Sequence, residues 1–218
     1  MKIIFSTITL VLSSLLFCQN TGTSEFGMKN GTLNINSTSI DHDNINEKHY
    51  LGKEAFAKVD NYPEQVEYKY NAYTDTFEFK EGAKRRALDK RIGQKVVFVD
   101  GRIFEFLNYK DLNNNLVSGY LQLLSNEISN KILLYKQTKL SETTSLNKNS
   151  YDGSAGTINY RSETNYYISD SNYIIPLPKS AKKIEAILKV DVQEIVKKNK
   201  LNLNKEEDLI KLIDLLNK

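Results

Sequence analysis

Residues 66–80 alternate apolar and polar side chains with a period of two, and this pattern constrains the fold more than any other feature of the chain. The apolar positions are Val66, Tyr68, Tyr70 and Ala72 in VEYKYNAY, followed by Phe77 and Phe79 in TFEFK. Because successive side chains of a β-strand point to opposite faces, each run predicts a strand with one buried face. The residues YTDT between the two runs predict the turn of an antiparallel pair.

A second hairpin is predicted around the Asp100-Gly101 pair in VFVDGRIFEF. An Asp-Gly pair favours a two-residue type I′ turn, in which both central residues have a positive φ. Such a turn sets three opposed pairs, which are Val99 with Arg102, Phe98 with Ile103 and Val97 with Phe104. Both faces near the turn are then apolar, which predicts a hairpin inside a sheet that serves packing rather than a site.

The chain up to Pro178 carries further strand signals. We expect strands at 116–124 and 131–140, and a last pair at 163–170 and 172–178. The stretch 141–158 is rich in Ser, Asn, Thr and Gly, and therefore predicts a long loop.

Helical signals begin after Pro178. Ser180, Asp191 and Asn204 stand where N-caps are expected, and the last two have a glutamate three residues later, as in a capping box. The last of these segments has one apolar stripe, formed by Leu209, Leu212, Ile213 and Leu216. The pattern predicts three short helices that each bury one face.

Strands first and helices last predict an α+β fold. We expect a curved antiparallel β-sheet, a meander or half-barrel of about eight strands, followed by a C-terminal helical tail, with a two-sheet β-sandwich as the alternative. The expected segments are a signal peptide at 1–18, a flexible N-terminal leader at 19–50, an antiparallel β domain at 51–178 and a C-terminal helical segment at 179–218.

The first residues have the layout of a secretory signal peptide, with Lys2 before an apolar stretch that ends at Phe17. This layout predicts an exported protein, located in the periplasm, at the outer membrane or outside the cell. No later stretch is apolar over the roughly 20 residues that a transmembrane helix needs. Cys18 is the only cysteine, and its lipidation is the less favoured alternative because Phe17 is bulky. A mature chain without Cys18 forms no disulfide.

The candidate catalytic and metal-binding residues do not form a recognisable constellation, so we expect neither a cofactor nor a metal. His42 and His49 lie in DHDNINEKH, where a solvated acidic loop is favoured over a metal site. Ser154 in DGSAG has no histidine downstream of it, which disfavours a catalytic triad.

Charged residues leave two further alternatives open. Glu67, Asp75 and Glu78 would supply the carboxylates of a glycan hydrolase, although cross-strand Glu–Lys pairs explain them better. The basic run at 84–91 would give weak association with an anionic surface, and a solvated connector is favoured over it. The net charge is only +3 and no stacking motif has basic flanks, which argues against a nucleic-acid partner.

The stretch YKYNAYTDTFEF resembles a family of uncharacterised secreted proteins from Bacteroidetes-type bacteria, in residues Tyr70 to Tyr73 and in Asp75. Lys69 stands where that family has arginine, and Thr76 where an acidic residue is common. The tail KKNKLNLNKEEDLIKLIDLLN is similar to the Lys-rich helical end of the same family. The resemblance implies export and a shared scaffold over residues 50–218, and it implies no activity.

These observations favour a non-enzymatic binding or interaction module of the cell envelope. Its expected partner is another envelope protein or an apolar or glycan ligand, and its oligomeric state is left open. The candidate binding residues are those of the motif, namely Tyr70, Asn71, Tyr73 and Asp75. The alternative for Asn71 and Asp75 is that they only shape the turn.

Overall fold

The structure is a computed structural model that describes residues 37–40, 46–60, 65–125, 131–145, 157–169 and 173–218. Within these ranges, eleven strands precede three α-helices, and all strands belong to one antiparallel sheet that stays open. The predicted antiparallel sheet with helices near the C-terminus is therefore confirmed. The predicted signal peptide with Cys18, and also His42 and Ser154, lie outside the described residues.

The elements have the following bounds. The strands are β1 (Ser37–Ser39), β2 (Tyr50–Val59), β3 (Val66–Asn71), β4 (Thr76–Glu81), β5 (Lys84–Leu88), β6 (Lys95–Phe98), β7 (Ile103–Lys110), β8 (Leu116–Leu123), β9 (Leu133–Ser145), β10 (Thr157–Ser169) and β11 (Ile174–Pro176). The helices are the short 3₁₀ helix η2 (Glu47–His49) and α1 (Ala181–Leu188), α2 (Val192–Asn199) and α3 (Glu206–Leu216).

The expected count of about eight strands is wrong, because three strands lie where the sequence pattern is weak. β1 is only three residues long. In β2 a bulge between Leu51 and Ala55 breaks the alternation of side chains. β5 has the sequence KRRAL, and its basic residues suggest a connector rather than a strand. Its arginines instead form ion pairs, Arg85 with Glu54 of β2 and Arg86 with Glu81 of the neighbouring β4.

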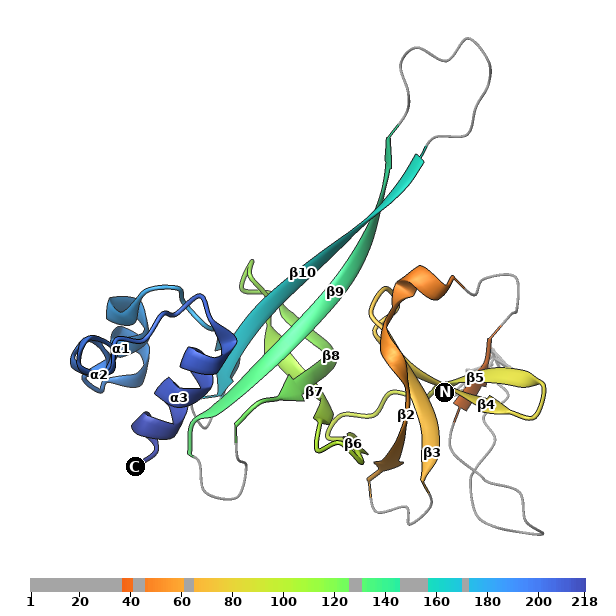
Figure 1. The fold of residues 1–218 in the computed structure, drawn as a ribbon, viewed down its shortest axis with the longest axis horizontal. Helices are drawn as coiled ribbons and strands as arrows, with labels where there is room; N and C mark the ends of the chain where they lie inside the picture. Colours follow the sequence, from red (N-terminus) through yellow and green to blue (C-terminus); the bar gives the residue numbers. More distant parts are fainter. Residues whose placement is uncertain (1–36, 41–45, 61–64, 126–130, 146–156, 170–172) are drawn as a thin grey trace, which may run out of the picture.

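β2 joins the two halves of the sheet, whose strand order is β1-β5-β4-β3-β2-β6-β7-β8-β9-β10-β11. It pairs with β3 on one side and with β6 on the other. Figure 1 shows β2–β5 at one end of the molecule and the helices at the other, with β9 and β10 running between them as a long twisted ribbon.

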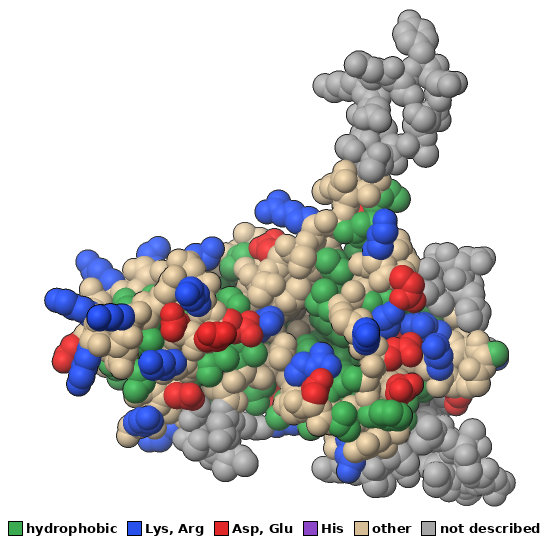
Figure 2. Space-filling model, in the orientation of Figure 1, with side chains coloured by type: hydrophobic (Ala, Val, Ile, Leu, Met, Phe, Trp, Pro, Cys, Tyr) green, Lys and Arg blue, Asp and Glu red, His purple; other side chains and the backbone are tan. Residues whose placement is uncertain are grey.

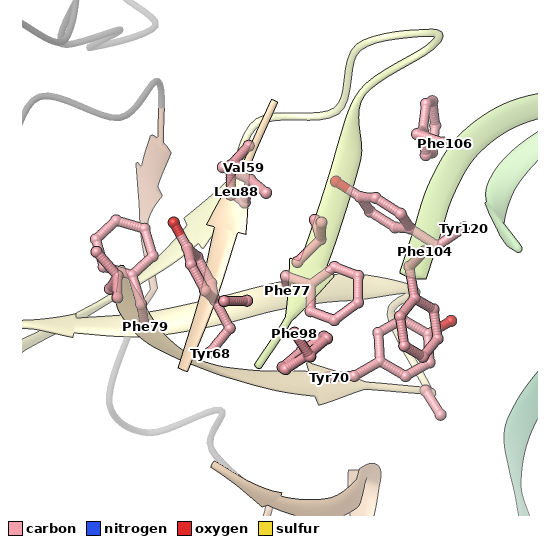
Figure 3. Packing of buried hydrophobic residues seen from close by; sticks show 14 residues of the cluster. Val59, Tyr68, Tyr70, Phe77, Phe79, Leu88, Phe98, Phe104, Phe106 and Tyr120 are labelled. Carbon is pink, nitrogen blue, oxygen red and sulfur yellow. The ribbon is translucent and has the colours of Figure 1, made fainter. Parts of the chain in front are cut away.

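The main core forms where the first half of the sheet packs against β6–β8. Phe77 of β4 lies at its centre, fully buried, with its ring 4.8 Å from Tyr120 of β8 and 5.2 Å from Phe104 of β7. Tyr70 of β3 also contacts Phe104, at 5.6 Å between ring centroids. Figure 3 shows these rings pointing into one cluster from both halves. The period-two strands predicted at 66–80 therefore bury the faces expected.

The turn of the second hairpin differs from the prediction. Val97 is opposite Ile103 and Val96 opposite Phe104, so the register is shifted by one residue. Gly101 has a φ of +88°, whereas Asp100 is not among the residues with positive φ, so a type I′ turn does not form. The N–H of Phe98 donates to the C=O of Arg102 around a three-residue loop. The hairpin does lie inside the sheet, between β2 and β8.

The predicted loop at 141–158 is wrong at both of its ends, where residues 141–145 belong to β9 and residues 157–158 to β10, and its middle, 146–156, lies outside the described residues. β9 and β10 are each 13 residues long and are paired from Leu133 with Ser169 to Ser145 with Thr157. Threonine is β-branched and favours strands, so a Ser- and Thr-rich composition does not exclude an exposed two-stranded ribbon.

The helices pack on the base of this ribbon. Leu209 and Ile213 of α3 join Leu134 of β9 and Ile168 of β10 in one buried cluster. Asp191 caps α2 by accepting from the N–H of Glu194, as predicted. The predicted cap at Asn204 is wrong, because α3 begins one residue later, with Lys205 at its N-cap.

Candidate functional site

The structure divides the predicted binding residues between two sites on either side of β3. Tyr70 and Asp75 face the core, and Asn71 and Tyr73 line a cavity on the outside of the sheet. Asn71 also shapes the turn, because its Oδ1 accepts from the N–H groups of Tyr73 and Thr74, both at 3.1 Å.

The β3–β4 turn, residues 72–75, is inserted between two strands that separate. β8 pairs with β9 only through Gln122 with Lys136 and Leu123 with Tyr135. Beyond that point, the N–H of Tyr120 on β8 donates to Asp75 Oδ2 at 3.1 Å. On the other side, the N–H of Leu140 on β9 donates to the C=O of Ala72 at 3.0 Å. The turn therefore completes hydrogen bonds that the separated strands do not make with each other.

Asp75 is held between the separated strands β8 and β9 by buried neighbours. The hydroxyl of Tyr70 donates to Asp75 Oδ1 at 2.5 Å. Gly119 of β8 leaves the necessary space, since a Cβ at that position would lie 2.8 Å from Asp75 Oδ2 and 3.0 Å from Gln137 Nε2. Burial raises the pKa of Asp75, and burial together with the Asp75 carboxylate raises the pKa of Tyr70. The contacts of Asp75 are those of a residue that anchors the turn.

The raised pKa of Asp75 predicts a stability difference that changes with pH. The folded state binds the Asp75 proton more tightly than the unfolded state, so this contribution is fully present below the unfolded pKa and is lost as the pH rises through the folded pKa. Asp75→Asn removes this pH-dependent contribution, because the asparagine side chain does not titrate. We expect the stability advantage of the unsubstituted chain over Asp75→Asn, measured by urea unfolding, to shrink as the pH rises from about 4, the ordinary pKa of an aspartate, through the raised pKa of folded Asp75. A difference that stays constant with pH contradicts this.

The outer cavity has a volume of about 450 Å³ and lies over β3, β4 and β5. It is lined by Ile40, His49, Tyr50, Asn71, Tyr73, Thr74, Thr76, Glu78 and Ala87. Tyr73 is 46% exposed, and its ring stacks on the ring of His49, with centroids 4.4 Å apart and an angle of 15° between planes. His49 is buried, and its Nε2 lies 2.5 Å from Glu142 Oε1 of β9. The fixed ring of His49 therefore supports one face of the Tyr73 ring.

The polar base of the cavity is organised around Glu78. Its side chain is only 4% exposed and accepts from the Tyr50 hydroxyl at 2.5 Å and from Asn71 Nδ2 at 2.9 Å. Arg85 Nη1 lies 3.8 Å away. Burial and the bond to Glu78 raise the pKa of the Tyr50 hydroxyl, which therefore stays protonated as a donor. The sequence predicts Glu78 on an exposed face, and the structure buries it.

The carboxylates considered for a hydrolase do not lie in one cavity. Glu78 lines the outer cavity, whereas exposed Glu67 lines a separate, smaller pocket of about 220 Å³ beside Glu54 and Lys80. Asp75 is in the core on the opposite side of the sheet, bonded to Tyr70. A glycosidase needs two carboxyl groups on either side of the scissile bond, and this arrangement does not provide them.

The arginines of the basic run are engaged in ion pairs. Arg85 and Arg86 contact Glu54 and Glu81, and Arg91 Nη2 lies 2.7 Å from Asp60 Oδ2. On the face in Figure 2, many Lys and Arg side chains lie over the helical end, and acidic side chains lie among the basic ones there and elsewhere. In the described part of the chain, no helix has the length and apolarity to cross a membrane, and no group of three or more candidate ligands could hold a metal ion.

The fold and the outer cavity define an antiparallel-sheet protein with an aromatic cavity on its outer face. No protein-family model, curated protein or solved structure matches the chain. Export and the resemblance to a secreted family therefore stay predictions.

Proposed function

We propose that this protein is an exported, non-enzymatic binding module of the cell envelope that takes a neutral glycan in the outer cavity. The observation that carries the proposal is the half-exposed ring of Tyr73, stacked on buried His49. One face of a pyranose ring consists of C–H groups with a slight positive charge, and these pack against the negative face of an aromatic ring.

The stacked rings of Tyr73 and His49, which would form the platform for a sugar, are held in place before a ligand arrives. His49 is fixed by Glu142, and its ring forms a T-shaped pair with the ring of Tyr160, with centroids 5.7 Å apart. The backbone that carries Tyr73 is fixed by Asn71. A ring that is already held loses little entropy when a ligand packs on it, which favours binding.

Polar groups around the platform suit hydroxyls rather than anions. Thr74 and Thr76 line the cavity with hydroxyl groups that lie 2.6 Å from each other. The Glu78 carboxylate at the base would repel a negatively charged ligand. A neutral sugar, with one C–H face and several hydroxyls, satisfies both features.

Tyr73→Ala tests this proposal. We expect the purified chain to bind some member of a panel of neutral oligosaccharides (gluco-, manno- and chito-oligosaccharides) in calorimetric titration. Tyr73→Ala should weaken that binding at least about tenfold, because the stacking surface is lost. Tyr73→Phe keeps the ring and should bind like the unsubstituted chain. The matched control is Tyr173→Ala, which removes an exposed tyrosine that lines a different pocket.

Two results would contradict the proposal. One is binding that Tyr73→Ala leaves unchanged, and the other is an absence of binding across the whole panel. Recovery of the oligosaccharides after prolonged incubation separates binding from hydrolysis. We expect them intact, and new reducing ends that disappear in Glu78→Gln would instead support the hydrolase alternative.

A further inference from the structure

The outer edge of β10 has backbone groups that no described strand takes up. β9 covers one side of β10 along its whole length, whereas β11 covers the other side only from Tyr167 to Ser169. The N–H of Leu177 extends this contact by one residue, to the C=O of Tyr166. Within the described residues, no strand pairs with the outer edge of β10 from 160 to 165.

The register with β11 shows which residues direct their backbone groups outward. The C=O of Tyr166 faces the β11 side, and alternate residues of a strand share the same hydrogen-bonding direction. The N–H and C=O groups of Tyr160, Ser162 and Thr164 therefore point away from β9.

We propose that this edge pairs with the same edge of a second copy of the chain, antiparallel and with a two-fold axis at Ser162. That axis sets Ser162 opposite Ser162 of the second copy, and Tyr160 opposite Thr164 of the second copy. Outward-directed groups then meet outward-directed groups, as an antiparallel ladder requires. The interface is isologous, so both copies use the same residues.

The charges of the edge favour this register over the two registers next to it. Arg161 and Glu163 are exposed and lie on the same face of β10, two residues apart. An axis at Ser162 sets each Arg161 against Glu163 of the second copy. Moving the axis by one residue, to Arg161 or to Glu163, sets two like charges against each other. Lys139 of β9 is already opposite Glu163, so Glu163 would lie between two cations.

The pairing also stops at two copies. With the axis at Ser162, residues 159–165 pair with 165–159 of the second copy. The next position on each side is Tyr166, whose C=O is already bonded to Leu177. The edge is thus fully used by one partner, which gives a closed dimer rather than an open array.

Charge reversal tests the pairing. We expect the chain to sediment as a concentration-dependent monomer–dimer mixture. Arg161→Glu or Glu163→Arg should each weaken dimerisation at least about tenfold, because each creates two like-charge pairs. The double reversal Arg161→Glu with Glu163→Arg restores opposite charges and should restore the dimer. Lys183→Glu, an exposed reversal on α1, is the matched control and should have no effect.

Cross-linking tests the register independently. In a Cys18→Ser background, Ser162→Cys would place two cysteines opposite each other at a Cα separation of about 5.5 Å, which is within the range of a disulfide. Thr164→Cys would place them about 14 Å apart. We expect mild oxidation to yield a covalent dimer only with Ser162→Cys. A chain that stays monomeric at its highest soluble concentration, or equal cross-linking of the two variants, would overturn the proposal.

Discussion

Asp75→Ala is expected to lower the free energy of unfolding by about 3 kcal/mol. The carboxylate accepts from the Tyr70 hydroxyl at 2.5 Å and from the Tyr120 N–H at 3.1 Å, and both donors are buried. Alanine leaves them without these acceptors, and an unsatisfied buried donor costs about 1–3 kcal/mol. Asp75 also has a φ of +55°, a conformation that aspartate and asparagine tolerate better than alanine.

Asp75→Asn separates the hydrogen bonds from the charge. Asparagine keeps an acceptor for the Tyr120 N–H and tolerates the positive φ, so we expect it to cost only about 1 kcal/mol at neutral pH. Both variants can be measured by urea unfolding at one pH, with hydrogen exchange of the Tyr120 amide as a local readout. That amide should exchange faster in Asp75→Ala than in Asp75→Asn. Equal stability losses in the two variants would show that Asp75 does not act through these bonds.

Local patterns were sufficient to predict which faces of β3 and β4 are buried. Val66, Tyr68 and Phe77 lie in the core as their period-two spacing indicates. The stripe of Leu209, Leu212 and Ile213 likewise predicts the buried face of α3. In both cases the information is contained within a few neighbouring residues, because the element and its apolar face follow from one periodicity.

The candidate sites depend on contacts that periodicity does not contain. Glu78 looks exposed by alternation, yet it is buried because Tyr50 and Arg85 come from strands that the pattern missed. His49 is fixed by Glu142, 93 residues away, on a ribbon that composition suggests is a loop. Asp75 reads as a turn residue, and its role as an acceptor for β8 depends on where β8 and β9 separate. The surroundings of these three residues are determined by contacts between strands that lie far apart in the sequence.

Gly119→Ala is expected to destabilise the chain by about 2 kcal/mol, although a glycine in a strand is normally the weaker choice by about 0.5–1 kcal/mol. The new Cβ would lie 2.8 Å from Asp75 Oδ2, an atom already fixed by the Tyr120 N–H. Gln137 Nε2 at 3.0 Å and the Tyr109 hydroxyl at 3.3 Å close the remaining space. Ser118→Ala, at the neighbouring exposed position, should change stability by less than about 0.5 kcal/mol.

A double-mutant cycle tests whether the stability loss in Gly119→Ala depends on Asp75 in the β3–β4 turn. If Gly119 is needed because Asp75 occupies the gap, Gly119→Ala should cost at least about 1 kcal/mol less in an Asp75→Ala background, where the nearest atom is gone. The four chains can be compared by urea unfolding under identical conditions. Losses that add within about 0.4 kcal/mol would mean that the two residues act independently. Strong coupling would instead mean that the β3–β4 turn and the separation of β8 from β9 form one structural unit, which positions Asn71 and Tyr73 at the outer cavity.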